Sequence, residues 1–272
     1  MAEISAAAVK ALRDKTQLPM MECKKALQAS GGDVEKAIEQ LRLDGKKTMQ
    51  GREDRETACG RIAIYADEKS GAMIELLCES PPVTNNEEFI QLAKDLAQSL
   101  AAKNQATADD LLNQPSPSRK GMTLKDQLDE LSNKIREVFR VNRTVRFDGA
   151  SGGYAHFNGA TGALLRISGG NAELAKDISM HITAQKPQAL TKEDLDPALV
   201  AKEREIQTEL ARKEGKPENI IAKMIEGRLR NFFAERVLIE QPFVKDDKQT
   251  VGKVAQAGGM KMHKFERWEL GK

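Results

Sequence analysis

Histidine and cysteine are the side chains in this sequence best suited to metal binding or nucleophilic catalysis. Three of each occur, widely spaced: His156, His181, His263, Cys23, Cys59 and Cys78. Metal sites use short spacings such as C-x-x-C and H-E-x-x-H, and neither pattern is present. The phosphate-binding patterns G-x-x-x-x-G-K-S/T and G-x-G-x-x-G are absent as well. We therefore predict that the protein is not an enzyme and has no metal site and no cofactor.

The composition argues against nucleic acid and membranes as partners. The 272 residues include 43 Lys and Arg and 41 Asp and Glu, so the net charge is only +2, and aromatic residues make up 4%. A nucleic-acid-binding surface needs a basic block or stacking aromatics, and we see neither. No apolar run approaches the length of a membrane span, and the amino terminus lacks the apolar core of a signal peptide. With an odd number of cysteines, we expect reduced thiols and a cytoplasmic protein.

Three short helices are predicted in the first 42 residues. Their apolar side chains recur at helical spacing: Ile4, Ala8, Leu12, Met20, Cys23, Leu27, Val34, Ala37, Ile38 and Leu41. The glycines at 31–32 are suited to ending the second helix, and Asp33 is suited to capping the third. Met20 shares a helical face with Leu27 and is therefore either a core residue or a contact for a partner. Met21 points away from that face.

Beyond these helices, strands and helices alternate. Residues 43–60 are charged and form either a solvated spacer or a contact surface. The elements predicted after them are a hairpin at 61–78, a helix at 89–102, a loop at 105–121, a helix at 124–138, a strand at 143–147, a hairpin at 154–167, a helix at 174–182, a helix pair at 199–232 and a final strand at 262–270.

The order of hairpin and then helix occurs twice, which indicates two related α/β subdomains. The predicted fold class is therefore α+β: an amino-terminal three-helix bundle, followed by two such subdomains with antiparallel strands and a helical pair. The predicted boundaries are 1–55 for the helical module and its tether, 56–140 for the first subdomain and 141–272 for the second.

Several segments closely resemble the bacterial elongation factor Ts family. They are "MAEISAAAVKALRDKTQLPMMECKKALQASGGDVEKAIEQLR" at the amino terminus, "ELLCES", "SMHITAQKP", "EGKPENIIAKMIEGRL" and "EQPFVKDDKQTVG". The resemblance covers essentially the whole chain, with 104–123 its weakest part. It implies a fold like the ubiquitin-associated domain for the bundle. It also implies a guanine nucleotide exchange factor that promotes GDP release from elongation factor Tu during translation elongation, with the GDP-bound and nucleotide-free GTPase as its partner.

The resemblance also assigns residues to the partner interface. In the family the bundle docks on the GTPase, a loop after the second strand reaches toward the nucleotide, and a helix end with a histidine makes a second contact. The matching residues are Arg13, Met20, Met21, Ser80, Pro81, Pro82, Val83, His181 and Gln185. For His181 the alternative is a solvated imidazole at a helix end.

The loop departs from the family pattern. Where the family usually reads Thr-Asp-Phe-Val, this sequence reads Ser80-Pro81-Pro82-Val83, so the acidic residue and the aromatic wedge are both replaced. Two prolines fix φ and remove two amide donors, which predicts a stiff, extended loop. Three hypotheses remain open: an exchange factor with a modified loop, a divergent paralogue that binds or chaperones the GTPase without exchange, and a ubiquitin-like-protein binder acting through the bundle.

Overall fold

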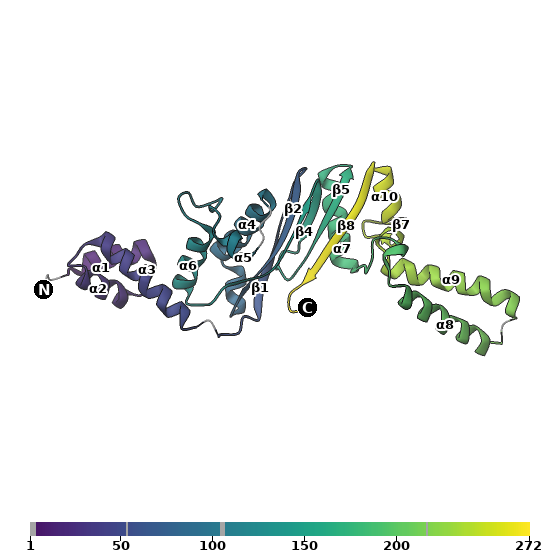
Figure 1. The fold of residues 1–272 in the computed structure, drawn as a ribbon, viewed down its shortest axis with the longest axis horizontal. Helices are drawn as coiled ribbons and strands as arrows, with labels where there is room; N and C mark the ends of the chain where they lie inside the picture. Colours follow the sequence, from purple (N-terminus) through teal and green to yellow (C-terminus); the bar gives the residue numbers. More distant parts are fainter. Residues whose placement is uncertain (1–3, 53, 104–106, 216) are drawn as a thin grey trace.

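The structure, a computed structural model, describes residues 4–52, 54–103, 107–215 and 217–272. The molecule is elongated, with a three-helix bundle at one end, two sheets in the middle and a projecting helix pair at the other end (Figure 1). The helices are α1 (Ala6–Thr16), α2 (Met20–Ala29), α3 (Val34–Gln50), α4 (Glu87–Ala102), α5 (Ala108–Leu112), α6 (Leu124–Ile135), α7 (Ala172–Gln185), α8 (Pro197–Lys213), α9 (Glu218–Arg236) and α10 (Val251–Ala257). The strands are β1 (Cys59–Ala66), β2 (Ser70–Cys78), β3 (Arg140–Asp148), β4 (Ser151–Ala155), β5 (Thr161–Gly169), β6 (Pro242–Phe243), β7 (Asp246–Thr250) and β8 (Met260–Glu269). Short 3-10 helices are η1 (Pro81–Asn85), η2 (Lys192–Asp194) and η3 (Leu238–Glu240).

Helices α1 to α3 enclose a small apolar core. Leu12, Cys23 and Leu27 are almost completely buried in it, because their helical spacing places them on inner faces. Asp33 caps α3: its side chain accepts hydrogen bonds from the backbone N–H groups of Glu35 and Lys36, at 3.0 and 3.1 Å. The glycines at 31–32 both have positive φ, which side chains with a Cβ rarely adopt. The predicted bundle is thus confirmed.

Two three-stranded antiparallel sheets form the centre of the molecule. The first has the strand order β1-β2-β3 and the second β4-β5-β8. Helix α4 covers the outer face of the first sheet and α7 the outer face of the second, so the layers run helix, sheet, sheet, helix (Figure 1). The α+β class and the repeated order of hairpin and helix are as predicted.

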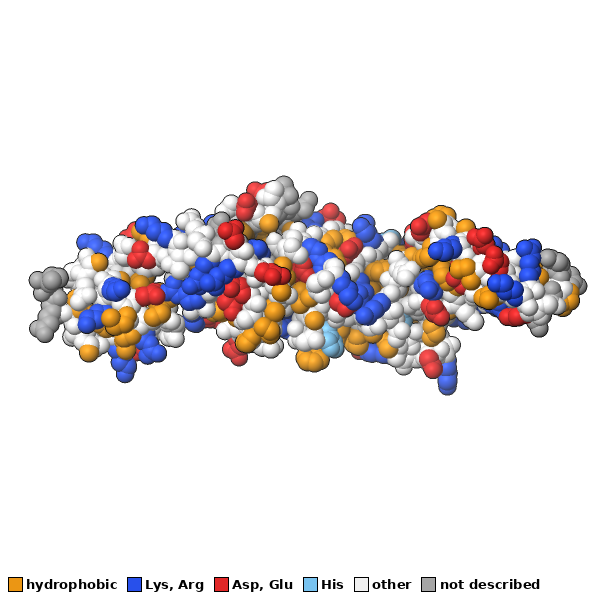
Figure 2. Space-filling view, turned by 90° about the horizontal axis from the view of Figure 1, so that it is seen from below, with side chains coloured by type: hydrophobic (Ala, Val, Ile, Leu, Met, Phe, Trp, Pro, Cys, Tyr) orange, Lys and Arg blue, Asp and Glu red, His pale blue; other side chains and the backbone are white. Residues whose placement is uncertain are grey.

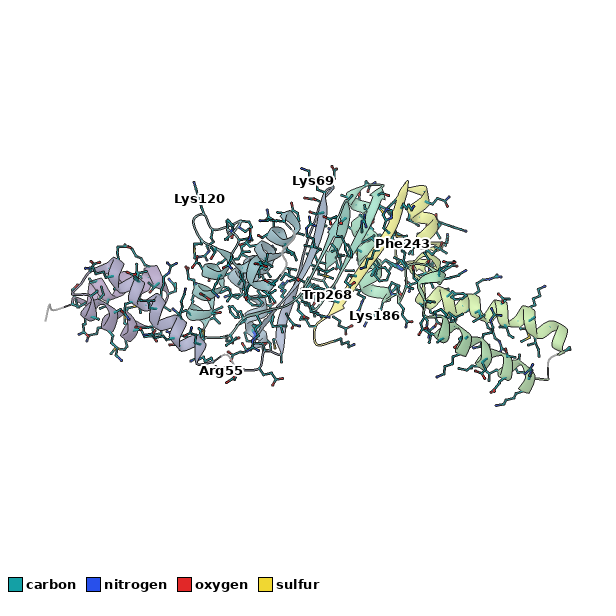
Figure 3. The ribbon with its side chains drawn as sticks, viewed as in Figure 1. Arg55, Lys69, Lys120, Lys186, Phe243 and Trp268 are labelled. Atoms are coloured by element: carbon teal, nitrogen blue, oxygen red, sulfur yellow. The ribbon has the colours of Figure 1, made fainter. Side chains whose placement is uncertain are left out.

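The inner faces of the two sheets pack on each other. Along β1 successive side chains alternate, so Ala63 faces α4 whereas Ile62 packs against Trp268 of β8. Trp268 is labelled in Figure 3, and the guanidinium of Arg143 lies 4.9 Å from the centre of its ring. The sheets approach closely because glycine stands at the contact: a Cβ at Gly162 would lie only 3.0 Å from Ile62 Cγ2.

Strand β3 belongs to the first sheet. It pairs with β2 in antiparallel register, with Val145 opposite Met73. A subdomain boundary at 140/141 would therefore separate this strand from the sheet that it completes, and the pairing favours a boundary after residue 148. The division of the chain into three folding units stays a prediction.

Some elements were not expected from the sequence. Helix α5 lies inside the segment predicted as a loop, because Thr107 and Asp110 form a capping box that starts a helical turn. Residues 105–106 of that segment lie outside the described residues. Strands β6 and β7 and helix α10 are too short to produce a visible periodicity, and they lie between the helix pair and β8.

Helices α8 and α9 form a hairpin that projects from the body (Figure 1). Ala211, Ile225 and Leu229 are buried between them. Three apolar residues of α8 stay between 38% and 43% exposed: Leu199, Ile206 and Leu210. None of the helices described in the structure is long and apolar enough to cross a membrane.

Candidate partner-binding surface

The bundle presents two methionines and an arginine to solvent. Met20 is 45% exposed and Met21 is 61% exposed, and Arg13 on α1 is exposed as well. The interpretation of Met20 as a core residue is wrong, because Leu18, which is 6% exposed, fills the core just ahead of α2. A methionine side chain is flexible and apolar, so this pair offers an adaptable contact surface. Hydrophobic side chains are visible on the bundle in Figure 2.

The loop after β2 is a turn of 3-10 helix, η1. Ser80 is extended, at φ −122° and ψ 148°, and Pro81 and Pro82 occupy the first helical positions. An N–H at the start of a helix has no partner within that helix, so proline costs nothing there. The expectation of an extended loop is therefore wrong. The turn closes through Thr84, whose Oγ1 donates to the carbonyl of Pro81 at 2.7 Å.

Glu137 anchors the start of this loop. Its Oε2 accepts from the N–H groups of Glu79 and Ser80 at 3.1 and 3.0 Å, and Ser80 Oγ donates to its Oε1. The Cys78 thiol donates to the Ser80 carbonyl at 3.4 Å. Burial raises the pKa of Cys78 to about 12, so the thiol remains a protonated donor at neutral pH. The polar groups of Ser80 are therefore engaged within the chain.

The four predicted loop residues differ in what they expose. Pro81 and Pro82 are exposed and Ser80 is half-buried. Val83 is only 7% exposed and packs in the core of the first subdomain with Phe89. The turn of 3-10 helix directs this side chain inward, and the assignment of Val83 to the partner interface stays a prediction.

His181 is also buried rather than presented at the surface. It is 0% exposed; its Nε2 lies 3.0 Å from Gln241 Oε1, and its Nδ1 accepts from the N–H of Val244 at 3.2 Å. Because Nδ1 is an acceptor, Nε2 carries the proton and the ring is neutral. Burial lowers the pKa of His181, and the hydrogen bond to Gln241 opposes this effect.

His181 thus ties α7 to the segment around β6. The alternative of a solvated imidazole is wrong because the side chain is buried, and the contact role of His181 stays a prediction. Gln185, one helical turn further on, is exposed, and its carbonyl accepts from Gln241 Nε2 at 3.4 Å. Phe243, labelled in Figure 3, packs its ring 5.9 Å from the imidazole.

Comparison with known proteins identifies the family. The family model for Elongation factor TS matches residues 82–272. The elongation factor Ts of Kineococcus radiotolerans is 39% identical over 277 residues, which cover 100% of both chains. The chain belongs to the elongation factor Ts family. Its relatives from Methylococcus capsulatus and Azoarcus sp. are 40% and 42% identical, over 98% and 100% of this chain and 92% of each relative.

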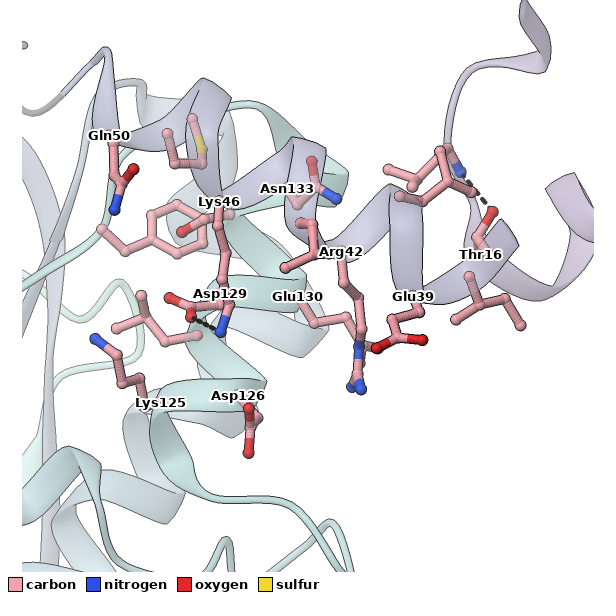
Figure 4. Close-up of a pocket in the computed structure, with 18 of the residues that line it drawn as sticks. Thr16, Glu39, Arg42, Lys46, Gln50, Lys125, Asp126, Asp129, Glu130 and Asn133 are labelled. Atoms are coloured by element: carbon pink, nitrogen blue, oxygen red, sulfur yellow. Dashed lines mark hydrogen bonds and ion pairs between the residues drawn. The ribbon is translucent and has the colours of Figure 1, made fainter. Parts of the chain in front are cut away.

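In this family member the charged segment after residue 43 is a contact surface, not a solvated spacer. Helix α3 continues to Gln50 and lies along α6, as the close-up in Figure 4 shows. Lys46 pairs with Asp129 at 3.5 Å and Arg42 with Glu130 at 3.8 Å. A cavity of about 750 Å³ lies between the bundle and α6. The bundle is therefore docked on the first subdomain through α3.

Two residues next to η1, Phe157 and Arg61, were not predicted as site residues from the sequence. Phe157, in the turn between β4 and β5, is 81% exposed. Arg61 on β1 donates hydrogen bonds both to this turn and to η1. Only the tertiary structure brings the two turns together, since 73 residues separate Thr84 from Phe157 along the chain. An exposed aromatic has no periodic signal that would mark it in sequence.

The residues at 149–153, Gly-Ala-Ser-Gly-Gly, match the serine-nucleophile pattern G-x-S-x-G, which the sequence analysis did not single out. Catalysis needs the serine on a turn from strand to helix, with a histidine beside it. Here Ser151 begins β4, is 8% exposed and donates to the Gly149 carbonyl at 3.0 Å. Ser151 therefore stabilises the turn before β4, and it is not placed as a catalytic nucleophile. Within the described part of the chain, no group of three His, Cys, Asp or Glu side chains is placed to hold a metal ion.

Proposed function

We propose that the protein is a guanine nucleotide exchange factor that promotes GDP release from elongation factor Tu in the cytoplasm. The observation that carries this proposal is the similarity of 39% to 42% identity over essentially the whole chain to proteins named elongation factor Ts. Relatives of this similarity match the bundle as well as both sheets, so the proposal extends to every unit of the fold.

Exchange of this kind is thermodynamic linkage. The factor binds the nucleotide-free GTPase more tightly than the GDP-bound form, so factor and nucleotide weaken each other's affinity by the same ratio. Each tenfold of mutual weakening requires about 1.4 kcal/mol of differential contact. No covalent step takes place, and the factor acts without a cofactor.

Three exposed regions are proposed to contact the GTPase. Arg13, Met20 and Met21 form the first, on the bundle, and Pro81 with Pro82 forms the second. Gln185 is the third, because it is exposed at the end of α7. Ser80, Val83 and His181 support these surfaces from within: Ser80 holds the start of η1, Val83 packs beneath it and His181 holds α7.

Stopped-flow release of a fluorescent GDP analogue from the cognate elongation factor Tu tests the proposal. Saturating factor should accelerate release relative to the GTPase alone. A heat-unfolded sample of the same chain is the control for non-specific effects. Unchanged release at saturation would overturn the proposal.

The second candidate function is a divergent paralogue that binds or chaperones the GTPase without exchange. The observation in its favour is the replacement of the family's acidic and aromatic loop residues by Pro81 and Pro82. Calorimetric binding to the GTPase, together with unchanged GDP release, would select this function over exchange.

A further inference from the structure

Phe157 is exposed in a way that folding does not explain. At 81% it is the most exposed large hydrophobic side chain among the described residues. Its ring lies 4.6 Å from that of His156, centre to centre, at 55°, and is otherwise open to solvent. A single exposed hydrophobic residue is ordinary on a protein surface. The structure around Phe157, however, is held by hydrogen bonds.

The turn that carries Phe157 is fixed from within. The N–H of Gly159 donates to the His156 carbonyl at 2.8 Å, and the N–H of His156 donates to the Thr161 carbonyl at 2.9 Å. The His156 ring meets the Tyr154 hydroxyl at 3.1 Å through Nδ1. Gly159 has a φ of 72°, and a Cβ there would overlap the side chain of Arg61.

Arg61 joins this turn to η1. Its Nη2 donates to the Phe157 carbonyl at 2.6 Å and its Nη1 to the Thr84 carbonyl at 2.9 Å. The backbone of β1 adds a bond from the N–H of Ile62 to the Gly159 carbonyl at 2.8 Å. Because one guanidinium holds both carbonyls, Phe157 stands next to the loop that carries the exposed prolines. Because the backbone of the turn is already fixed, only the side chain of Phe157 has to be ordered when a partner buries it, which lowers the entropic cost of binding.

We propose that Phe157 is an anchor residue of the interface with the GTPase, inserting into an apolar crevice next to the surface that Pro81 and Pro82 contact. The inference rests on the proposed function. Its basis is the continuity of the turn with η1 through Arg61, which makes one composite surface of the two. Buried aromatic anchors in preformed positions carry much of the binding energy of protein interfaces.

The test compares Phe157→Ala with Ile206→Ala, a substitution of an exposed apolar residue on the distant α8 hairpin. Dissociation constants for the nucleotide-free GTPase are measured by calorimetry, with melting temperatures and GDP release alongside. Phe157→Ala should weaken binding roughly tenfold to a hundredfold and slow release, with an unchanged melting temperature. Phe157→Trp should retain most of the affinity, and Ile206→Ala should bind like the wild type.

The outcomes separate this inference from the proposed function. A wild type that accelerates GDP release, with Phe157→Ala binding equally well, overturns the anchor and leaves the exchange function intact. A wild type that does not bind the GTPase overturns both. If Phe157→Ala instead changes the self-association of the protein in analytical ultracentrifugation, Phe157 mediates contact between two copies of the chain. That result would also overturn its proposed role as an anchor for the GTPase.

Discussion

At the residue scale, exposure distinguishes a proposed contact side chain from a core side chain on the same short helix. Met21 is 61% exposed on α2, whereas Leu27 on the same helix is 0% exposed. Both are apolar and of similar size, so composition does not separate them. A side chain that is already in water loses little when truncated, unless a partner covers it.

Met21→Ala should weaken binding to the GTPase by roughly tenfold while changing the free energy of unfolding by less than about 0.5 kcal/mol. Leu27→Ala should cost roughly 2 to 5 kcal/mol, because it leaves a cavity in a small core. Calorimetric binding and urea unfolding of both variants give the comparison. Similar losses of stability in the two variants would contradict the exposed position of Met21.

His181 shows the opposite case, a polar residue with a structural role. Its folded pKa lies below the ordinary value of 6.5, because burial disfavours the charged ring. The unfolded chain therefore binds a proton at a pH where the folded chain does not. The contribution of His181 is complete above pH 6.5 and is lost as the pH falls toward the folded pKa.

We expect the free energy of unfolding to fall between pH 7.5 and pH 5 more steeply in the wild type than in His181→Gln. Glutamine can still hydrogen-bond to Gln241, but it does not titrate. Urea unfolding at several pH values provides the measurement, and the difference between the two proteins isolates the contribution of residue 181. Parallel curves would show that His181 does not take part in the acid loss of stability.

At the element scale, local geometry decides how α3 meets α6. Gly45 lies on the face of α3 that contacts α6, and a Cβ at this position would overlap the side chain of Asn133. Asn133 is 8% exposed, and its Oδ1 has no hydrogen-bond partner among the described residues. The helices therefore approach so closely that only glycine fits.

Gly45→Ala should loosen this contact, with a net loss of stability of up to about 2 kcal/mol. Overpacking costs roughly 1 to 3 kcal/mol, and the higher helix propensity of alanine returns about 1 kcal/mol. The control is Gly51→Ala at the end of α3, where a Cβ would have ordinary contacts at 3.7 and 3.8 Å. Melting temperatures and limited proteolysis after residue 50 report the effect. A Gly45→Ala variant that is more stable than the wild type would contradict the close packing.

At the scale of the whole molecule, the fold is a row of separate cores. The buried cluster of the bundle shares no described residue with the clusters around α4 and α7. The bundle contacts the first subdomain where α3 packs against α6. Arg136, which follows α6, adds an ion pair with Glu22 of α2. The ion pairs on this contact are partly exposed and contribute little each.

A fragment comprising residues 56–272 should therefore fold without the bundle, with a modest loss of stability from the uncovered face of α6. Binding to the GTPase should weaken, because Arg13, Met20 and Met21 are removed. Circular dichroism, thermal unfolding and calorimetry test both statements against the full chain. Loss of a cooperative unfolding transition would show that the bundle and the sheets form one folding unit.

The sequence by itself determined the bundle, both hairpins, the long helices and the α+β class, because periodicity and capping are written in neighbouring residues such as Asp33 and Val34. It also indicated an exposed Met21. Only the tertiary structure decided that Val83 and His181 are buried, that α3 docks on α6 and that Phe157 adjoins η1. Each of these depends on contacts between distant segments, as when His181 meets Gln241 across 60 residues. Burial is a property of the packed chain, and local spacing does not encode it.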